Sequence, residues 1–319
     1  MPPHSTDTRP SIQHFPPFDP KSPILIFGEI LADVFPDRTV LGGAPFNVAR
    51  HLAAFGLEPV MVSRIGNDEL GAEILRTMRG SDMRTDGVQI DPDLPTGRVM
   101  VHINGGTHSF EILPMQAYDC IDPGEAGRIA RAVNPSRLYF GSLGQRHEIS
   151  RSALVAILQC VHAHRILDIN LRSPWYTPET LHFSMRNADF VKLNTEELHI
   201  LANLEGFDLD SPHEQARSLL QAFELDRIVI TCAQAGAWHM NGSGDIHGAA
   251  RPGRPVHVVD TVGAGDAFTA ACILGMSSGW PADLTLDRAN GFATAICGIR
   301  GAVPDHAEFY APFFKEWTL

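Results

Sequence analysis

A bare turn with one carboxylate at its end stands out in the stretch DTVGAGDAFTA, residues 260–270. Gly263, Ala264 and Gly265 place almost no side-chain atoms before Asp266, and the residues that follow have the composition of a buried helix. Backbone N–H groups that are exposed at the start of a helix, at the positive end of its dipole, form an anion-binding site. Taken alone, the same stretch fits a flexible loop in which Asp266 is a first-turn helix acid.

An anion site combined with a carboxylate suits the transfer of a phosphoryl group. Negative charge spreads over the phosphoryl oxygens in the transition state, so N–H donors stabilise it, while a positioned aspartate accepts the proton of the attacking hydroxyl. The sequence contains neither G-x-x-x-x-G-K-[ST] nor G-x-S-x-G. A dinucleotide-binding fingerprint also fits poorly, because Phe268 stands where its third glycine belongs.

The composition excludes several classes of partner and site. The 319 residues carry a formal net charge of −12, which argues against nucleic acid and anionic membranes as partners, because basic surfaces bind both. The five cysteines show no C-x-x-C spacing, so we expect no disulfide framework. His162 and His164 are two residues apart with no H-E-x-x-H motif nearby, so we expect no zinc site. Residues 1–20 are rich in Pro, Ser, Thr and Asp and lack the apolar segment of a signal peptide, which predicts a disordered tail. Since no apolar run is long enough to span a membrane, we expect a soluble cytoplasmic protein.

Strand-like and helix-like segments alternate along residues 21–319, which we expect to form one domain. The apolar run PILIFGEI predicts a central parallel strand that is buried on both faces. The segment APFNVARHLAAFG predicts a helix that ends at Gly56. Continued alternation of this kind predicts an α/β fold with a doubly wound, mostly parallel sheet and helices on both faces.

Two stretches break the alternation. Residues 97–113 hold two strand-like segments joined by Asn104, Gly105 and Gly106, which predicts an antiparallel hairpin, and residues 33–41 form a second strand-like excursion. Together they predict a small inserted β-sheet that acts as a lid over the carboxyl ends of the main strands, where open α/β sheets bind ligands. The alternative is a simple edge hairpin. An exposed edge of the lid sheet would offer a contact for a homodimer.

Several motifs are similar, in order and spacing, to those of the ribokinase-like (PfkB-type) carbohydrate kinases, and particularly to the fructokinase branch. They are GEILADVFPD, GGAPFNVARHLAAFG, LDINLRSPW, KLNTEEL, DTVGAGDAF and ANGFATAICGIRGAVP. The resemblance extends from about Ile24 to Pro304, and several ordered motifs are far more specific than one glycine turn. It implies a ribokinase-like fold and an enzyme that phosphorylates a sugar with ATP.

The resemblance also implies roles for residues of the substrate site, with Asp266 as the catalytic base. The anion hole corresponds to Gly263, Ala264 and Gly265, and the groups that hold sugar hydroxyls correspond to Asp33, Gly43 and Asn47. The chemistry agrees, because a carboxylate accepts two hydroxyl donors, an amide both donates and accepts, and glycine lets a sugar approach the backbone. Without the family, Asp33 would be a strand-end turn residue and Asn47 a first-turn helix residue.

Other positions correspond to the nucleotide and metal sites of the family. The nucleotide positions are Asn194, Thr231, Gly236 and Asn290. Asn194 and Glu197 match an N-x-x-E element that organises Mg²⁺ and phosphates, partly through water, and they also form a capping box for the helix that follows. A monovalent cation site, for which K⁺ is the expected ion, corresponds to Asp260, Val262, Ile296, Ile299 and Gly301.

Departures from the family pattern bear on the substrate. Leu31 stands where ribokinases have a polar residue that contacts ribose, and Ala44-Pro45 replaces their Gly-Gly-Lys-Gly continuation, so ribose is disfavoured. Arg172 corresponds to an arginine that kinases of 2-keto-3-deoxygluconate place near the substrate acid group, although a guanidinium suits a phosphate or a helix C-terminus equally well.

We therefore predict ATP- and Mg²⁺-dependent phosphorylation of fructose at a primary hydroxyl. The alternative enzymes are a kinase of 2-keto-3-deoxygluconate and a kinase of a related ketose or nucleoside. An alternative of another class is a catalytically silent regulator that binds a sugar or a nucleotide on the same fold.

Overall fold

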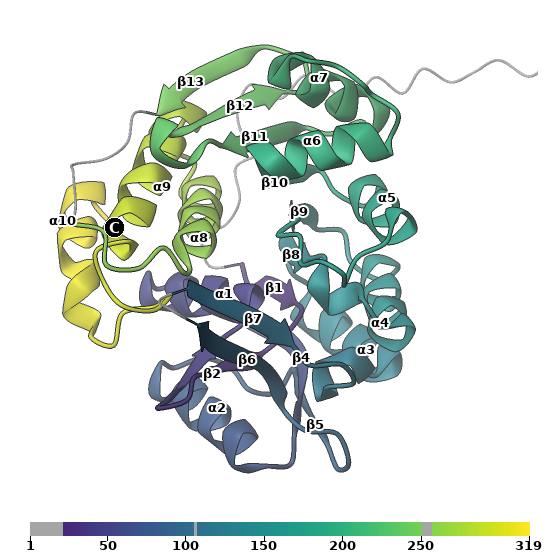
Figure 1. The fold of residues 1–319 in the computed structure, drawn as a ribbon, viewed down its shortest axis with the longest axis vertical. Coiled ribbons are helices and arrows are strands. Elements are labelled where there is room, and N and C mark those ends of the chain that lie inside the picture. The colour runs from purple at the N-terminus through teal and green to yellow at the C-terminus, as the bar shows by residue number, and fades with distance from the viewer. Residues whose placement is uncertain (1–21, 105–106, 251–256) are drawn as a thin grey trace, which may run out of the picture.

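The computed structural model describes residues 22–104, 107–250 and 257–319. Within these residues a nine-stranded sheet is flanked by helices, and a separate four-stranded sheet stands beside it (Figure 1). The predicted α/β class, with a doubly wound, mostly parallel sheet and a small second sheet, is confirmed. The predicted disordered tail (residues 1–20) and the two glycines of the predicted hairpin turn lie outside the described residues.

The large sheet is built almost entirely from parallel pairs. Its strands are, in order across the sheet, β13 (Ile246–Ala250), β12 (Ala237–Asn241), β11 (Arg227–Thr231), β10 (Phe190–Asn194), β9 (His164–Asp168), β8 (Arg137–Gly141), β1 (Ile24–Phe27), β4 (Pro59–Gly66) and β5 (Val88–Asp91). From β11 to β5 all neighbours pair in parallel, whereas β12 and β13 join through antiparallel pairs.

Strand β1 shows why the centre of the sheet reads as a continuous apolar run. It pairs with β4 on one side and β8 on the other, and all four of its residues are buried. Ile24 and Ile26 belong to the core on one face of the sheet, while Leu25 and Phe27 belong to the core on the other face. A strand with helices on both sides has no polar face, because successive side chains point to opposite faces.

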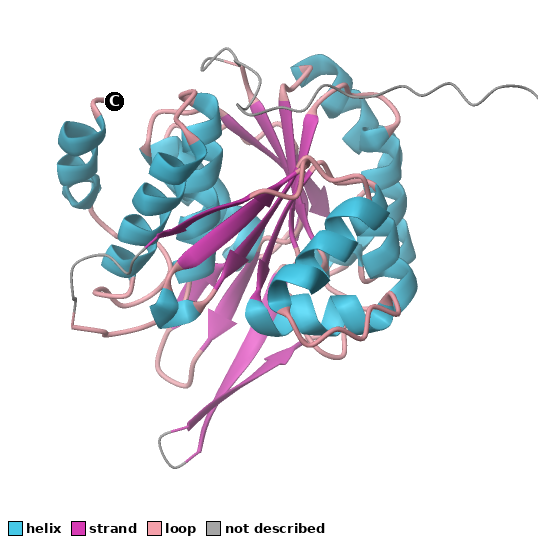
Figure 2. Cartoon of the chain, turned by 90° about the horizontal axis from the view of Figure 1, so that it is seen from above, coloured by secondary structure: helices cyan, strands magenta, loops and turns pink. Residues whose placement is uncertain are grey.

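The helices form one layer on each face of the sheet (Figure 2). On the face of Ile24 lie α1 (Ala44–Ala54), α2 (Glu69–Gly80), α8 (Ala264–Ser277), α9 (Ala282–Ile296) and α10 (Ala311–Trp317). On the face of Leu25 lie α3 (Pro123–Val133), α4 (Glu148–Leu158), α5 (Pro178–Arg186), α6 (Thr195–Leu204) and α7 (Pro212–Ala222). Short 3-10 turns are η1 (Ala117–Cys120), η2 (Leu143–Gln145), η3 (Ala233–Ala235) and η4 (Ala307–Tyr310). None of the helices in the described ranges combines the length and the apolar character that crossing a bilayer requires.

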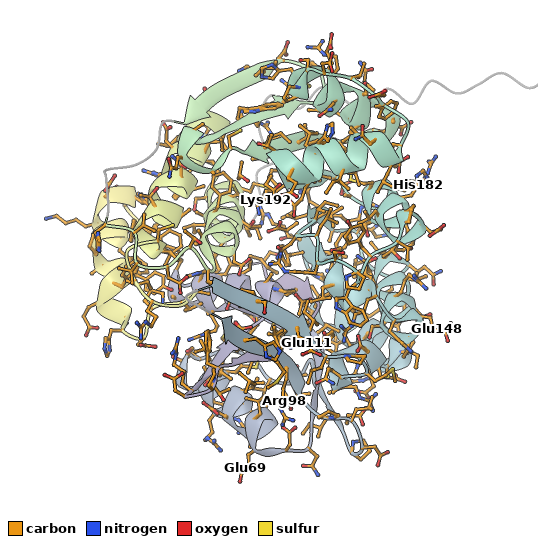
Figure 3. All side chains as sticks on the ribbon, viewed as in Figure 1. Glu69, Arg98, Glu111, Glu148, His182 and Lys192 are labelled. Atoms are coloured by element: carbon orange, nitrogen blue, oxygen red, sulfur yellow. The ribbon has the colours of Figure 1, made fainter. Side chains whose placement is uncertain are left out.

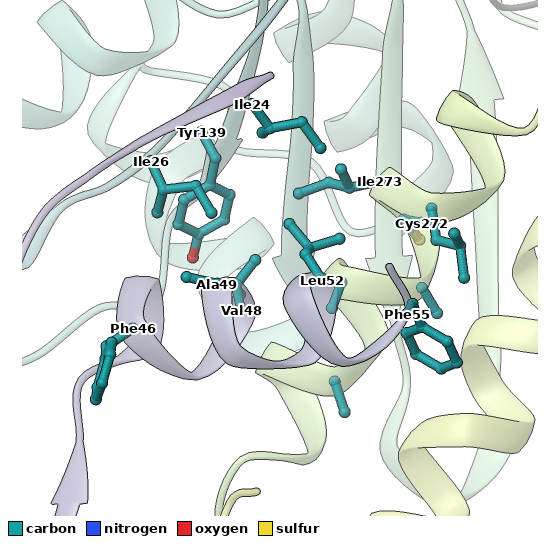
Figure 4. Packing of buried hydrophobic residues seen from close by; sticks show 14 of the residues in the cluster. Ile24, Ile26, Phe46, Val48, Ala49, Leu52, Phe55, Tyr139, Cys272 and Ile273 are labelled. Atoms are coloured by element: carbon teal, nitrogen blue, oxygen red, sulfur yellow. The ribbon is translucent and has the colours of Figure 1, made fainter. Parts of the chain in front are cut away.

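The first of these layers joins segments that are far apart in the sequence. Figure 4 shows α1 packed between the sheet and the C-terminal helices, with Phe46, Leu52 and Phe55 in the same cluster as Ile273 of α8. Helix α8 is buried along almost its whole length, from Asp266 to Ser277. This packing holds the first turn of α8 next to the first turn of α1.

The small sheet has the strand order β3-β2-β6-β7 and differs in one respect from the prediction. Its strands are β2 (Leu31–Val34), β3 (Thr39–Gly42), β6 (Gly97–Asn104) and β7 (Thr107–Ile112). The excursion predicted at 33–41 is not one strand but a hairpin, in which Phe35 N–H donates to the Arg38 carbonyl at 2.9 Å. Pro36 and Asp37 occupy the turn, and these residue types favour turns over extended strand.

Candidate active site

A single cavity of about 480 Å³ lies where the carboxyl ends of β1, β8 and β9 meet the small sheet and the first turns of α1 and α8. Crevices at the carboxyl ends of parallel strands are the usual ligand sites of open α/β sheets. The predicted substrate-site residues that line this cavity are Asp33, Gly43, Asn47, Arg172, Gly263, Gly265 and Asp266. Residues more than 200 positions apart in the sequence therefore meet around one space.

Asp266 lies in the first turn of α8 and is held by α1. Its Oδ2 accepts a hydrogen bond from Asn47 Nδ2 at 2.8 Å, which fixes the orientation of the carboxylate. Burial raises the pKa of Asp266 to about 6; the hydrogen bond from Asn47 and the charge of Lys192 oppose this rise, and the nearby Asp168 adds to it. A carboxylate with a pKa near 6 is ionised at neutral pH and is a stronger base than an ordinary aspartate.

The turn before Asp266 holds backbone N–H groups that have no acceptor in the described part of the chain. Gly263 caps α8 in the left-handed conformation, with φ of 78°, and the helix has no side-chain cap. Ala264 N–H donates to the Thr261 carbonyl at 3.3 Å, but the N–H groups of Gly263, Gly265 and Asp266 have no acceptor among the described residues. Of the predicted anion hole, Gly263 and Gly265 therefore keep available donors and Ala264 does not, while Asp266 adds a donor of its own.

A buried ion pair lies beside this turn. Lys192 Nζ donates to both carboxylate oxygens of Asp168, at 3.0 and 3.3 Å, and the Thr269 hydroxyl donates to Asp168 at 2.7 Å. Figure 3 places Lys192 in the interior next to α8, whereas the labelled His182 and Glu148 extend from the periphery. A Cβ added at Gly265 would lie 3.3 Å from Lys192 Nζ, so the missing side chain brings the ammonium close to the anion hole.

The wall formed by β1, β2 and the start of α1 carries two further carboxyl groups. Burial raises the pKa of Asp33 to about 6 and that of Glu29 to about 7, although the charge of Arg172 lowers both. Gly43 has a φ of 103°, and a Cβ at this position would lie 2.7 Å from the Glu29 carbonyl oxygen. Glycine at this N-cap therefore lets the chain turn tightly against Glu29.

Apart from Asp33, the side chains of the small sheet that line the cavity are apolar. Leu31 packs with Val99, Tyr118 and Leu143, and Leu31 also lines the cavity. Phe110 and Ile112 of β7 complete this wall, and Phe110 is exposed. Leu31 thus adds an apolar side chain to the lining of the cavity.

Arg172 lines the cavity from the loop after β9. Its Nη1 donates to the Leu171 carbonyl at 3.2 Å, and the guanidinium forms no ion pair within the part of the chain that the structure describes. It lies close enough to Glu29, Asp33 and Asp266 to lower the pKa of each carboxyl. The other cation of the cavity, Lys192, is paired with Asp168.

None of the four predicted nucleotide positions lines this cavity. Asn194 ends β10 and pairs in register with Thr231, which ends β11. Gly236 follows η3 with a φ of 89°, and Asn290 is buried on α9. The structure thus places Asn194 and Thr231 at the same edge of the sheet as the cavity.

Glu197 forms the predicted capping box. Its Oε2 accepts from Asn194 N–H at 2.8 Å, while Asn194 Oδ1 accepts from Glu197 N–H at 2.8 Å. Oε1 accepts a further hydrogen bond from Leu171 N–H at 2.9 Å. Each oxygen keeps a second lone pair, so this carboxylate fits a contact to metal-bound water, the manner in which Mg²⁺ is commonly held.

The predicted monovalent cation positions come together through Asp260. Asp260 Oδ1 accepts from Val262 N–H at 3.0 Å and Oδ2 accepts from Gly301 N–H at 3.1 Å. The carboxylate thereby joins the segment before α8 to the segment after α9, which holds Ile299, while Ile296 is the last residue of α9. No group of three or more His, Cys, Asp or Glu side chains suited to a metal ion occurs among the described residues.

Seven polar residues that line the cavity were not predicted as site residues: Glu29, Tyr139, Ser142, Asp168, Asn170, Lys192 and Thr261. Asp168 ends the buried strand β9, and an acid at the carboxyl end of an apolar strand is a signal that could have found it. Lys192 is one of only three lysines in the chain, and it is buried on β10. Glu29 lies two residues after the buried strand β1 and carries the same signal as Asp168, whereas Tyr139 lies within an apolar run and carries none.

Comparison with known proteins shows a family to which the chain is similar over most of its length. The family described as pfkB family carbohydrate kinase matches residues 18–307. Fructokinase-2 of Zea mays is 27% identical over 276 residues, which cover 80% of this chain and 80% of the maize protein.

Solved structures show the same fold. Fructokinase from Vibrio cholerae O395, solved with fructose, ADP and calcium ion, has a TM-score of 0.74 and 24% identity, and the match covers 92% of this chain and 99% of that one. A double mutant of the Vibrio enzyme, with the same TM-score of 0.74 and 23% identity over the same 92% and 99%, was solved with fructose, ADP and potassium ion. Fructokinase from Xylella fastidiosa with bound ATP has a TM-score of 0.78 and 22% identity, with 94% and 100% covered.

Proposed function

The chain belongs to the pfkB family of carbohydrate kinases, and we propose that it transfers the γ-phosphoryl group of ATP to a primary hydroxyl of fructose. As a member of that family it is a phosphotransferase that acts on an alcohol group of a sugar. The choice of ATP as donor is supported by the ATP and ADP in the Xylella and Vibrio fructokinase structures. The choice of fructose rests on those relatives and on the chemistry of the cavity.

One observation supports the mechanism above all others. A buried carboxylate with a raised pKa, Asp266, lies at the start of a helix next to N–H groups that have no acceptor in the described ranges, in the same cavity as side chains able to bind hydroxyl groups. The carboxylate would take the proton of the attacking hydroxyl, and the N–H groups of Gly265 and Asp266 would stabilise the charge that develops on the phosphoryl oxygens. Asn47 holds the base in place through its hydrogen bond.

We assign the nucleotide to the sheet edge beside this cavity, with contacts to Asn194, Thr231, Gly236 and Asn290. Each carboxylate oxygen of Glu197 already accepts one backbone hydrogen bond and keeps one lone pair. Glu197 would therefore contact a Mg²⁺ ion through a bound water molecule. When bound, the ion supplies positive charge to the phosphates. Lys192 supplies a second positive charge near Gly265 from the protein itself.

We further propose that a K⁺ ion binds beside the anion hole. Asp260 draws the two segments that would bind the ion together by accepting from Val262 and Gly301. The potassium in the Vibrio double-mutant structure supports this assignment. The ion would stiffen the turn that precedes α8.

The charges of the cavity favour a neutral substrate over an acid. Glu29, Asp33, Asp168 and Asp266 line it, against Arg172 and Lys192, and Lys192 is already paired. A carboxylate brought into this space would face several acids and one unpaired guanidinium, at a cost in Coulomb energy. A sugar hydroxyl has no such cost and can donate to each acid.

A substrate panel tests this choice. We expect fructose to give the highest kcat/KM among fructose, 2-keto-3-deoxygluconate, ribose and adenosine in an assay coupled to ADP release. We also expect Arg172→Met to lower kcat/KM for fructose by less than about tenfold, because a neutral substrate makes no ion pair with it. The exposed Arg76→Met on α2 is the matched control for loss of an arginine.

The opposite outcome is equally clear. The wild type would then prefer 2-keto-3-deoxygluconate to fructose by tenfold or more in kcat/KM. Loss of this preference in Arg172→Met, but not in Arg76→Met, would show that Arg172 forms an ion pair with a substrate carboxylate. Loss of such a pair typically lowers kcat/KM by tens-fold or more. This result would identify the keto-deoxy acid as the substrate in place of fructose and would leave the family assignment intact.

The raised pKa of Asp266 predicts the pH dependence. The base acts only when it is ionised, so kcat/KM should fall by about tenfold per pH unit below pH 6 and level off above pH 7. The pKa of Asp33 is also about 6, so the decrease of kcat/KM on the acid side of the pH profile becomes steeper if the charge of Asp33 is needed to bind the sugar. Asn47→Ala removes a hydrogen bond that lowers the pKa of Asp266. The acid limb of the kcat/KM profile should therefore move to higher pH, even if the maximum kcat/KM is also lower. An acid limb at the same pH in both proteins would contradict the assignment of that limb to Asp266.

A further inference from the structure

Three oxygen atoms in the wall of the cavity lack hydrogen-bond partners. Glu29 Oε2, Asn47 Oδ1 and the Tyr139 hydroxyl are buried, and within the described residues none of them has a partner. All three residues line the cavity. Buried polar atoms without partners cost about 1–3 kcal/mol each, so a fold tolerates them chiefly where a ligand or water completes them.

Tyr139 is held in place by the core, and Glu29 by its burial next to the Gly43 turn. Tyr139 is on β8 and is fully buried in the cluster of Ile26, Phe46 and Ala49. Figure 4 shows its hydroxyl directed away from the sheet towards α1, the helix that carries Asn47. Glu29 follows β1 and is 4% exposed, with the tight Gly43 turn against its backbone. Neither side chain is free to turn out to solvent.

The hydrogen-bonding character of the three atoms is complementary to hydroxyl groups. Asn47 Oδ1 only accepts, whereas the Tyr139 hydroxyl both donates and accepts. Burial raises the pKa of Glu29 to about 7, so its carboxyl is partly protonated at neutral pH and then donates as well. A set that both donates and accepts matches sugar hydroxyls, which do the same, and it does not match a carboxylate, which only accepts.

We propose that Tyr139 and Glu29, together with Asn47, form the hydroxyl-reading floor of the substrate subsite and make the enzyme specific for an uncharged polyhydroxylated substrate. This inference rests on the proposed sugar kinase function and adds to it two residues that determine specificity. Tyr139 and Glu29 act on binding of the substrate and not on the proton transfer, which belongs to Asp266.

The test compares Tyr139→Phe and Glu29→Gln with a matched control. Tyr118 is the control, because its hydroxyl is also buried and unpartnered within the described residues, but Tyr118 does not line the cavity. We expect Tyr139→Phe and Glu29→Gln each to raise KM for fructose by about tenfold, with kcat within threefold and KM for ATP unchanged. Tyr118→Phe should leave all three constants unchanged.

Analogues of fructose that each lack one hydroxyl locate the contact. The wild type should bind one of these analogues more weakly than it binds fructose. Tyr139→Phe should bind that analogue and fructose with equal affinity, because the variant lacks the hydroxyl that distinguishes them. Thermal unfolding of each variant separates loss of the contact from loss of the fold; if Tyr139→Phe does not fold, Glu29→Gln and the wild-type analogue series decide.

The outcomes separate the two proposals. Unchanged KM in both folded variants, or a Tyr118→Phe effect as large as theirs, would overturn the hydroxyl-reading floor while fructose phosphorylation stands. If the wild type neither phosphorylates nor binds any sugar of the panel in calorimetry, both the floor and the proposed function are overturned.

Discussion

Replacing Asp266 by asparagine is expected to lower kcat by about two orders of magnitude or more, which is the range for loss of a general base. Asparagine keeps the shape of the side chain and can still be oriented by Asn47, but it cannot accept the proton of the attacking hydroxyl. KM for the sugar and for ATP should change by less than about threefold, because the variant keeps the N–H groups at the start of α8. Steady-state kinetics with fructose and ATP give all three constants.

Asp33→Asn is the comparison that separates the roles of two acids in one cavity. It should act mainly on KM, because Asp33 lies on the small sheet and we assign it to sugar hydroxyls. A kcat loss in Asp33→Asn that equals the loss in Asp266→Asn, or near-normal turnover in Asp266→Asn, would remove Asp266 from its role as base.

Gly263→Ala is expected to have the second largest effect. The residue caps α8 with a φ of 78°, and an added Cβ would overlap Cα and Cβ of Ala302. The turn must shift to relieve the overlap, which misaligns the N–H groups of Gly265 and Asp266, so kcat should fall by about tenfold to a hundredfold. The midpoint of urea unfolding should also fall.

Gly279→Ala is a matched control for the backbone part of this effect. Gly279 has a φ of 68°, and no atom of the described residues lies within 4 Å of a Cβ at that position. This variant should lose about 1–2 kcal/mol of unfolding free energy from the left-handed backbone alone, with kcat unchanged. If Gly263→Ala loses no more stability than Gly279→Ala and keeps its kcat, the shape of the turn is not what forms the anion hole.

The sequence predicted the fold well because its signals were local and repeated. The run from Ile24 to Phe27 is apolar at every position, which happens only when both faces of a strand are covered, and the structure confirms it. Residues 33–41 are predicted as one strand-like excursion, although Pro36 and Asp37 in its middle signal the turn that separates β2 from β3.

The candidate site was predictable only where chemistry and a local motif coincide. Asp266 and its glycine turn form one motif, and Asn47 belongs to another, but their hydrogen bond joins residues 219 positions apart. Lys192 and Asp168 lie on neighbouring strands, and their pairing depends on the strand order and register, which no short motif encodes. Tyr139 reads as one more core residue, because its ring is packed in the core and only its hydroxyl oxygen is polar.

The most direct test of the account is the product of the reaction. Phosphorus NMR can follow the reaction of the purified full chain with ATP, MgCl₂ and fructose. The Asp266→Asn variant is measured under the same conditions. The account predicts equal amounts of ADP and of one fructose monophosphate, with the ester on a CH₂ carbon, and at most about one-hundredth of that rate in the variant. ADP appearing with free phosphate alone, or no phosphate ester from wild-type protein that binds both ATP and fructose, would contradict it.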